Sequence, residues 1–418
     1  MNVPLLGSTE KVALATRPPT PGSGRRRSGG LGRLGQNRRD DGSTQTARVQ
    51  RRYDLDRAQL TEILAGEPPF RVRQVWDALY RRLAEPAECT DLPLALRDRM
   101  AAHRSLALSL TKLSEQVAGV GRSDDPQAGQ EGTVKWLFGL DDGPAIETVL
   151  MGYHDRSTVC VSSQAGCAMG CTFCATGQAG YSRQLRPGEI VEQVVLAARA
   201  ARGHRMRRLS NVVFMGMGEP LANYGSVAEA ITTLTGELGI SARRITVSTV
   251  GIVPGIERMA ADGRPVGLAL SLHAANDDLR SELVPQNRRY GLAQLAEACK
   301  LWTSATGRRL TLEWACMKGV NDSDEDVAEL ARFARELGAH VNLIPLNPTP
   351  GWSCEATPAS RVEDMADQLR RSGVNATVRR NRGRSIEAAC GQLAAPFGAG
   401  GGAAAPGTEA ASTCGLPA

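Results

Sequence analysis

Three closely spaced cysteines carry the strongest chemical signal in the 418-residue sequence. Cys167, Cys171 and Cys174 fall within eight residues, and soft thiolates at this spacing suit zinc or an iron–sulfur cluster. Three protein ligands leave one coordination position open, whereas a structural zinc site normally recruits a fourth cysteine or histidine. The spacing therefore predicts a metal centre that binds a further molecule.

A fourth cysteine of chemical interest lies in a basic environment near the carboxyl end. Cys390 follows four arginines placed between positions 379 and 384. Cationic neighbours lower the pKa of a thiol from its usual value of about 8.5, which favours the nucleophilic thiolate. Cys160 lies seven residues before Cys167, on a predicted strand beside the cysteine loop.

Alternating strands and helices must position these residues. Strand patterns cover 158–163, 211–215, 244–248, 266–271, 310–314 and 340–345, and helical patterns cover 188–202, 226–238, 254–261, 291–304, 323–337 and 360–372. This alternation predicts an α/β fold with a parallel sheet. Six strands are too few for a closed eight-stranded barrel, so we expect a partial βα barrel or an open doubly wound sheet. Ligands should collect at the carboxyl ends of the strands.

Polar residues gather where four of these strands end. They are Gly218 and Glu219 after the second strand, Ser248 at the end of the third, Ser271 and His273 at the fourth, and Asn347 after the sixth. Because the carboxyl ends of parallel strands share one edge of a sheet, these groups should face one site. They suit a zwitterionic ligand that also carries hydroxyl groups.

A small helical domain and a β-hairpin precede the alternating region. Helical periodicity covers 56–65, 70–83 and 92–103, and two strand patterns, 133–140 and 145–151, flank a turn. We therefore divide the chain into a basic arm (1–52), a helical accessory domain (53–108), a linker with the hairpin (109–152), an α/β core (153–385), a segment carrying Cys390 (386–393) and a tail (394–418).

Charge and composition separate the two ends from the folded body. Residues 1–52 hold eleven Lys or Arg against three acids, whereas the other 366 residues hold 39 basic and 41 acidic side chains. The arm and the Gly/Ala/Pro-rich tail cannot form a core, so both are predicted to be disordered. The sequence contains no apolar run of the roughly 18 residues that a membrane span requires and no secretory signal at its start. We expect a cytoplasmic monomer.

Five motifs together resemble a known family. In chain order they are Cys160-Val-Ser-Ser-Gln-Ala-Gly-Cys167, Gly216-Met-Gly-Glu-Pro220, Ser271-Leu-His-Ala274, Asn347-Pro348 and Ala389-Cys-Gly-Gln-Leu393. The cysteine loop after the first strand resembles the radical S-adenosylmethionine (SAM) superfamily. The whole set is similar to the bacterial dual-specificity methyltransferases that act on adenine C2 of 23S rRNA and tRNA. The resemblance spans residues 51–393 and includes neither the arm nor the tail.

The resemblance implies cofactors and residue roles. Cys167, Cys171 and Cys174 would hold a 4Fe-4S cluster whose open iron binds SAM, with two SAM molecules used per turnover and electrons supplied by a donor such as flavodoxin or ferredoxin. SAM contacts would come from Gly218, Glu219, Ser248, Ser271, Leu272, His273 and Asn347. In this family one cysteine takes a methyl group from the first SAM, and a radical from the second activates it for addition to C2. The matching residues are Cys390 as methyl carrier, Cys160 as resolving cysteine through a transient disulfide, and Glu147 as proton acceptor.

Two alternatives stay open at this point. A related radical SAM enzyme methylates C8 of an rRNA adenine, and the spacing of motifs does not distinguish C2 from C8. A non-enzymatic RNA-binding protein would instead use Cys167, Cys171 and Cys174 to bind zinc. The residues alone also favour a solvent-facing strand position for Glu147, and they contain no RNA-binding fingerprint, so the RNA substrate depends on the resemblance.

Overall fold

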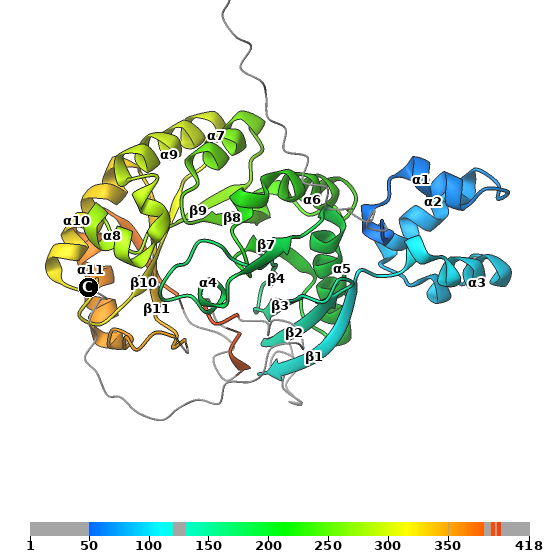
Figure 1. Cartoon of the computed structure of the whole chain (residues 1–418), viewed down its shortest axis with the longest axis horizontal. Coiled ribbons are helices and arrows are strands. Elements are labelled where there is room, and N and C mark those ends of the chain that lie inside the picture. Colours follow the sequence, from blue (N-terminus) through cyan, green and yellow to red (C-terminus); the bar gives the residue numbers. More distant parts are fainter. Residues whose placement is uncertain (1–49, 120–130, 350, 380–385, 389–390, 394–418) are drawn as a thin grey trace, which may run out of the picture. The chain divides into compact units, whose positions relative to one another are not determined.

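The computed structural model describes residues 50–119, 131–349, 351–379, 386–388 and 391–393 (Figure 1). The predicted arm up to residue 49, the predicted tail and Cys390 therefore lie outside the described residues. Within the described part of the chain, no helix is long and apolar enough to cross a membrane.

A ten-stranded mixed sheet organises the structure, in the order β1-β2-β3-β4-β7-β8-β9-β10-β11-β12. The strands are β1 (Leu110–Ala118), β2 (Gly132–Leu140), β3 (Ala145–Gly152), β4 (Ser157–Cys160), β7 (Leu209–Phe214), β8 (Ile245–Thr249), β9 (Gly267–Ser271), β10 (Thr311–Cys316), β11 (His340–Pro345) and β12 (Asn375–Val378). The first four strands are antiparallel neighbours, and the pairs from β4 to β12 are parallel. A separate hairpin pairs β5 (Gln164–Gly166) with β6 (Tyr181–Gln184).

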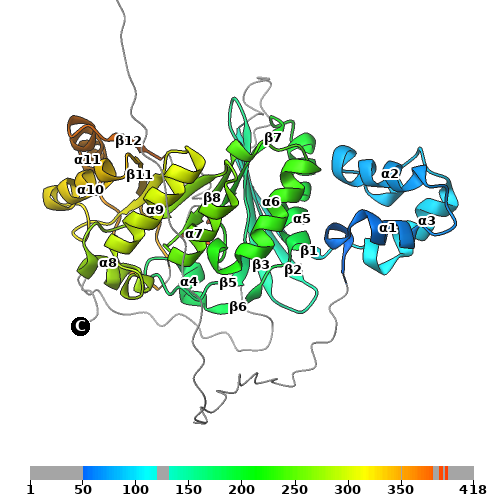
Figure 2. The same ribbon diagram turned by 90° about the horizontal axis from the view of Figure 1, so that it is seen from above.

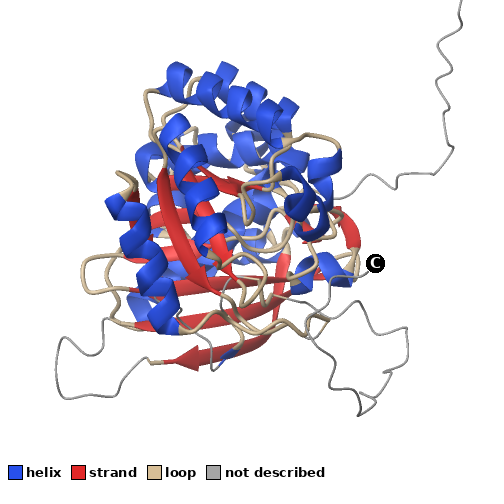
Figure 3. Ribbon diagram, turned by 90° about the vertical axis from the view of Figure 1, so that its left-hand side faces the viewer, coloured by secondary structure: helices blue, strands red, loops and turns tan. Residues whose placement is uncertain are grey.

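Helices surround the parallel strands. They are α5 (Pro187–Gly203), α6 (Tyr224–Gly236), α7 (Val253–Asp262), α8 (Asp277–Leu283), α9 (Leu292–Thr306), α10 (Asp324–Glu336) and α11 (Ala359–Arg371). Figures 1 and 2 show most of them along the outside of the strands, with the short α4 (Ala175–Ala179) inside. Coloured by element type, the strands form one continuous layer behind this cover (Figure 3). Ser323 caps the amino end of α10, because its Oγ accepts a hydrogen bond of 3.1 Å from the amide of Asp326.

The predicted helical domain consists of α1 (Arg57–Ile63), α2 (Phe70–Asp77), a π-helical turn η2 (Ala78–Arg82) and α3 (Leu94–Ala102). It shares one apolar core with α5, and polar contacts add to this packing. Asp54 accepts a 2.9 Å hydrogen bond from the amide of Gly188 in the first turn of α5 and pairs with Arg186 at 3.0 Å. Glu192 of the same helix accepts hydrogen bonds from the amides of Ser109 and Leu110 at 2.9 and 2.8 Å. These carboxylates fix the chain on both sides of the helical domain.

The predicted α/β fold with a parallel sheet is confirmed, but the strand count is corrected. The six predicted strands correspond to β4 and β7 to β11, and β12 adds a seventh parallel strand that the sequence did not suggest. The predicted hairpin is β2 and β3, and β1 widens it to three strands. Both strands that the prediction missed in this ten-stranded sheet lack an apolar pattern: β1 is exposed along most of its length, and β12 has four residues.

Candidate active site

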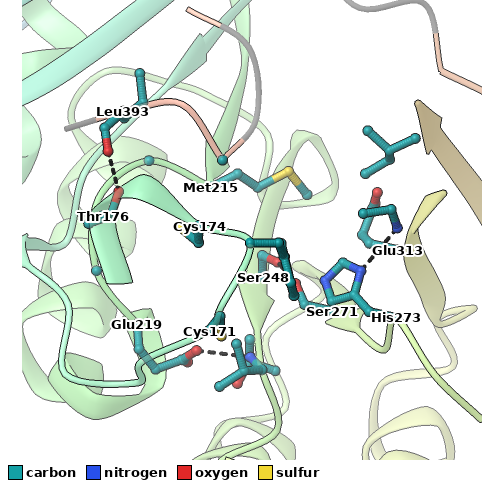
Figure 4. Close-up of a pocket in the computed structure, with 18 of the residues that line it drawn as sticks. Cys171, Cys174, Thr176, Met215, Glu219, Ser248, Ser271, His273, Glu313 and Leu393 are labelled. Atoms are coloured by element: carbon teal, nitrogen blue, oxygen red, sulfur yellow. Dashed lines mark hydrogen bonds between the residues drawn. The ribbon is translucent and has the colours of Figure 1, made fainter. Parts of the chain in front are cut away.

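The predicted site residues converge at the carboxyl edge of the parallel strands. One pocket is lined by Cys171, Cys174, Gly218, Glu219, Ser248, Ser271, His273 and Asn347 (Figure 4). Leu272 and Cys167 are absent from its lining. The Leu272 side chain is fully buried in the core, and its amide donates to the Glu313 carbonyl at 3.0 Å.

Glycines in the Gly216-Met-Gly218 loop allow close packing against the chain that follows β4. A Cβ atom at Gly216 would lie 2.7 Å from the carbonyl oxygen of Val161, and one at Gly218 would lie 2.5 Å from Cβ of Gln164. Gly218 also has a φ of 98°, a backbone conformation that residues other than glycine rarely adopt. The glycines therefore set the path of the loop that presents Glu219.

Glu219 is a buried carboxylate at the pocket wall. Its Oε1 accepts from the amide of Leu221 at 3.0 Å, and its Oε2 accepts from the amide of Val250 at 2.9 Å. Burial raises the pKa of Glu219 to about 7, although these amide donors oppose the shift. The backbone thus fixes the carboxylate in a position where it can accept from an ammonium or hydroxyl group of a ligand.

Hydroxyl and imidazole groups occupy the neighbouring strand ends. Ser248 Oγ and Ser271 Oγ lie 3.3 Å apart on β8 and β9. His273 Nδ1 accepts a 3.0 Å hydrogen bond from the amide of Ala315, which assigns the ring proton to Nε2. Burial lowers the pKa of His273 to about 3, so the imidazole is a neutral donor at physiological pH. The Phe173 ring packs edge-on against it at 4.6 Å.

The cysteine loop lies over this pocket. The amide of Thr172 donates to the Leu283 carbonyl of α8 at 3.2 Å, and the amide of Cys167 donates to Gly180 at 2.7 Å. Burial raises the pKa of Cys171 well above its usual value, and the nearby Cys174 and Cys167 thiols add to the shift. Among the described residues, no group of three or more potential ligands is gathered around a metal position.

The donor set fits an iron–sulfur cluster. The site offers three soft thiols, and two of them line the pocket that also contains Glu219, the serines and His273. Buried thiols stay neutral because a buried thiolate charge is costly. On binding a metal they become thiolates, and the charge of the metal compensates theirs. An open coordination position would face a pocket that suits an amino acid and a ribose.

A second group of predicted residues lies on the sheet beside the pocket. Lys135, Glu147 and Cys160 occupy β2, β3 and β4, and the register places Val149 opposite both Lys135 and Cys160. Because side chains alternate along a strand, all three project from the same face as Val149. Glu147 is buried and pairs with Lys135 Nζ at 3.3 Å. The solvent-facing position that the residues alone favoured for Glu147 is therefore wrong.

The chain on either side of Cys390 contacts both groups. Lys135 Nζ donates to the Glu387 carbonyl at 3.3 Å. Gly391, the residue after Cys390, lines the pocket. Its carbonyl accepts a 2.9 Å hydrogen bond from the amide of Ala175, the residue that follows Cys174 in the sequence. Figure 4 shows Leu393 beside α4, where its carbonyl accepts from Thr176.

Sequence reasoning missed two charged residues at this site. Glu313 on β10 lines the pocket, accepts a 2.8 Å hydrogen bond from Asn342, and has a pKa raised by burial. In the sequence, the only sign of this role is that Glu313 is a single acidic residue inside an otherwise mostly apolar strand. Arg280 on α8 is fully buried and donates from Nε to Leu272 and from Nη2 to Val250 and Ser271, all backbone carbonyls at the pocket edge. Its position after the Asn276 cap gave no such signal.

Comparisons with known proteins agree with this chemistry. A sequence model of the Radical SAM superfamily matches residues 161–331. A probable dual-specificity RNA methyltransferase RlmN of Salinispora tropica is 48% identical over 355 residues, covering 83% of this chain and 92% of the relative. The corresponding protein of Mycobacterium marinum is 48% identical over 341 residues, covering 80% and 91%.

A solved structure extends the likeness to three dimensions. The crystal structure of a radical SAM methyltransferase from Sphaerobacter thermophilus shares 49% sequence identity with a TM-score of 0.75. The match covers 82% of this chain and 99% of that one. With this identity over nearly the full length of its relatives, the chain belongs to the radical SAM dual-specificity RNA methyltransferases of the RlmN family.

Proposed function

We propose that this enzyme methylates C2 of adenosine in 23S rRNA and in tRNA, with Cys390 as methyl carrier. The observation that carries the proposal is the placement of the residues that flank Cys390: Glu387 contacts Lys135 of the Glu147 group, and Gly391 lines the cysteine pocket. The described residues on either side of Cys390 therefore contact the two groups, one on each side.

The pocket residues would hold the cofactors. Cys167, Cys171 and Cys174 supply thiolates to a 4Fe-4S cluster. Gly218, Glu219, Ser248, Ser271, His273 and Asn347 supply contacts to SAM, and Leu272 contributes through its backbone. When bound, the cluster and SAM supply the methyl group and the one-electron chemistry. The fixed Glu219 carboxylate accepts from the ammonium group, and the Nε2 proton of His273 is available to an oxygen of the ligand.

The second group performs acid–base and thiol chemistry. Cys390 Sγ carries the methyl group to adenine C2. Glu147 then accepts the C2 proton, and the Lys135 ammonium at 3.3 Å favours its deprotonated form. The Cys160 thiolate then attacks Cys390 Sγ: the S–S bond forms as the bond from Cys390 Sγ to the methylene carbon breaks, and that carbon keeps the electron pair and takes up a proton as the methylated base is released. Shared placement of Lys135, Glu147 and Cys160 on one sheet face supports this division of roles.

We further propose the architecture and surroundings of this chemistry. The parallel strands form a partial barrel, and the chain divides into the domains predicted from the sequence, with the helical domain contributing to RNA binding. The enzyme works as a cytoplasmic monomer, and flavodoxin or ferredoxin reduces the cluster. The relatives named above carry a dual-specificity description, which favours C2 over the C8 alternative and an enzyme over a zinc-stabilised binding protein.

Nucleoside analysis tests the proposal. Protein purified and reconstituted without oxygen is incubated with RNA, SAM and a reductant, and the digested nucleosides are separated against 2-methyl- and 8-methyladenosine standards. We expect 2-methyladenosine from wild type and from Cys89→Ala, a buried cysteine in the helical domain that serves as control, and none from Cys390→Ala. Formation of 8-methyladenosine, or a colourless zinc protein without product, would overturn the proposal.

A further inference from the structure

Two or three arginines lie in each of three loops that lead into the neighbouring parallel strands β7 to β10, at the edge opposite the pocket. Arg205, Arg207 and Arg208 precede β7, Arg243 and Arg244 precede β8, and Arg308 and Arg309 precede β10. We call these seven residues the arginine stripe. The loop before β9 carries Arg264, which is bonded to Ala228 and Thr232 and lies 4.0 Å from Asp262, so it is not included.

The sheet places these loops side by side. β7, β8, β9 and β10 are consecutive strands (Figure 1), and their parallel register pairs Val212 with Ile245 and Thr246 with Gly267. Three spacings between strands amount to about 14 Å. A duplex carries roughly one phosphate charge per 1.7 Å of its axis with both strands counted, so a duplex segment of this length carries about eight phosphates, of which those on the near side face the protein.

The positive charge of the stripe is not neutralised within the described structure. All its members except Arg308 are exposed. Among the described residues, Arg205, Arg208, Arg243, Arg244 and Arg309 form no ion pair; the nearby Glu237 instead pairs with Arg57 and accepts from Trp76. The pKa of Arg308 is lowered mainly by burial, with a smaller contribution from the positive charge of Arg243. The pKa of His340 is likewise lowered mainly by burial, with a smaller contribution from the charge of Arg309.

Helix dipoles account for only part of the stripe. A cation stabilises a helix only within about its last turn. Arg243 and Arg244 lie in the last turn of the short 3-10 helix η7 (Ala242–Arg244), and Arg205 and Arg308 directly follow the caps of α5 and α9. Arg207, Arg208 and Arg309 lie beyond these helix ends, so helix capping does not explain the stripe as a whole.

A hollow beside the stripe continues the basic surface onto the helical domain. It is lined by Arg81, Arg202 and Arg208 around an apolar floor that includes Leu83 and Ile240. Arg81 belongs to η2 and Arg202 to the last turn of α5. The hollow thus joins the amino-terminal edge of the sheet to the helical domain that is proposed to contribute to RNA binding.

We propose that the arginine stripe is a second RNA-contact surface, which binds phosphates of the substrate away from the target nucleotide. The inference rests on the proposed function, because that function supplies the polyanion. Strands of five or six residues separate the stripe from the pocket by roughly 20 Å. An RNA large enough to span this distance contacts both the pocket edge and the stripe edge of the sheet, whereas a short stem–loop bound at the pocket does not reach the stripe.

Salt-dependent binding tests the inference. The double variant Arg244→Gln/Arg309→Gln removes two exposed stripe charges, and Arg258→Gln/Arg332→Gln removes two exposed charges from outer helices α7 and α10 as a matched control. Binding of each protein to a full-length tRNA transcript and to a short stem–loop with the target adenosine is measured over a range of salt, without SAM. Each phosphate contact contributes about 0.7 to 0.9 to the slope of log K against log salt.

We expect the stripe variant to lower that slope by about 1.4 to 1.8 for tRNA, with no change for the stem–loop and no change for the control variant on either RNA. Unchanged tRNA slopes, or an equal loss on the stem–loop, would overturn the inference. Methylation of the stem–loop by wild type separates the two proposals. If wild type methylates no RNA, the proposed function fails, and if it methylates normally while the tRNA slopes are equal, only the stripe proposal fails.

Discussion

Replacing Arg280 with methionine should destabilise the fold and impair SAM binding together. The guanidinium makes four hydrogen bonds, to the carbonyls of Leu272, Val250 and Ser271 and, at 2.7 Å, to Asn287 Oδ1. Burial lowers the pKa of Arg280 to about 10, so it remains charged at neutral pH. Methionine has a similar length but no donor, and it leaves all four acceptors without this partner.

The expected magnitude follows from those acceptors. At about 1 kcal/mol for each lost hydrogen bond, the free energy of unfolding should fall by roughly 4 kcal/mol. The control is Arg361→Met, because Arg361 is partly exposed and makes two bonds, to the Asp322 carbonyl and the Asp324 carboxylate. Removing these should lower the free energy by about 1 kcal/mol.

Denaturant unfolding of the SAM-free protein measures the first effect, and calorimetric titration with SAM measures the second. Because Val250 and Ser271 line the pocket, SAM affinity should fall at least about tenfold, equivalent to 1.4 kcal/mol, in Arg280→Met and stay unchanged in Arg361→Met. Equal unfolding free energies for the two variants, with normal SAM affinity in Arg280→Met, would refute the assigned role of Arg280.

Three further changes test other parts of the structure. Lys135→Met removes the cation 3.3 Å from Glu147. The pH profile of product formation should shift to higher pH, because the carboxylate then loses its proton less readily. An unshifted profile would show that Lys135 does not act on Glu147 during the reaction. Burial raises the pKa of Glu192 from 4.5 to about 7, so the folded state binds this proton more tightly than the unfolded state does. The stability that protonated Glu192 contributes is present at pH 4.5 and is lost as the pH rises toward 7. The unfolding free energy of wild type relative to Glu192→Gln should therefore fall by up to about 3 kcal/mol over that range, and a pH-independent difference would contradict the shift. Gly218→Ala should abolish SAM binding, since its Cβ would meet Gln164 at 2.5 Å, whereas Gly225→Ala, with open space around it, should bind normally; equal binding by the two would show that the loop can move.

The sequence predicted the elements whose apolar patterns are long and regular. The central strands β8 to β10 are buried on both faces and the helices between the parallel strands bury one face, so their apolar runs and periodicity are visible without a structure. Strand β12 pairs with β11 over four residues, and β1 exposes both faces over most of its length. Backbone pairing rather than side-chain burial holds these two strands, and it leaves little pattern in a sequence.

The site was predictable where one motif holds several residues close in the chain, as in the cysteine loop and Gly216-Met-Gly-Glu219. Contacts between distant segments were not. The burial of Glu147 depends on Lys135 in the neighbouring strand, and the role of Arg280 depends on three carbonyls from two strand ends. Each residue alone is an ordinary charged side chain, and only the fold makes its surroundings apolar.

Trapping of the RNA–protein adduct tests the central claim most directly. If Cys390 carries the methyl group and Cys160 resolves it, reconstituted Cys160→Ala should accumulate a nuclease-sensitive covalent adduct with RNA. Peptide mass spectrometry should place the adduct at Cys390, and Cys390→Ala should form none. A folded, cluster-loaded Cys160→Ala enzyme that turns over normally without an adduct would contradict the account.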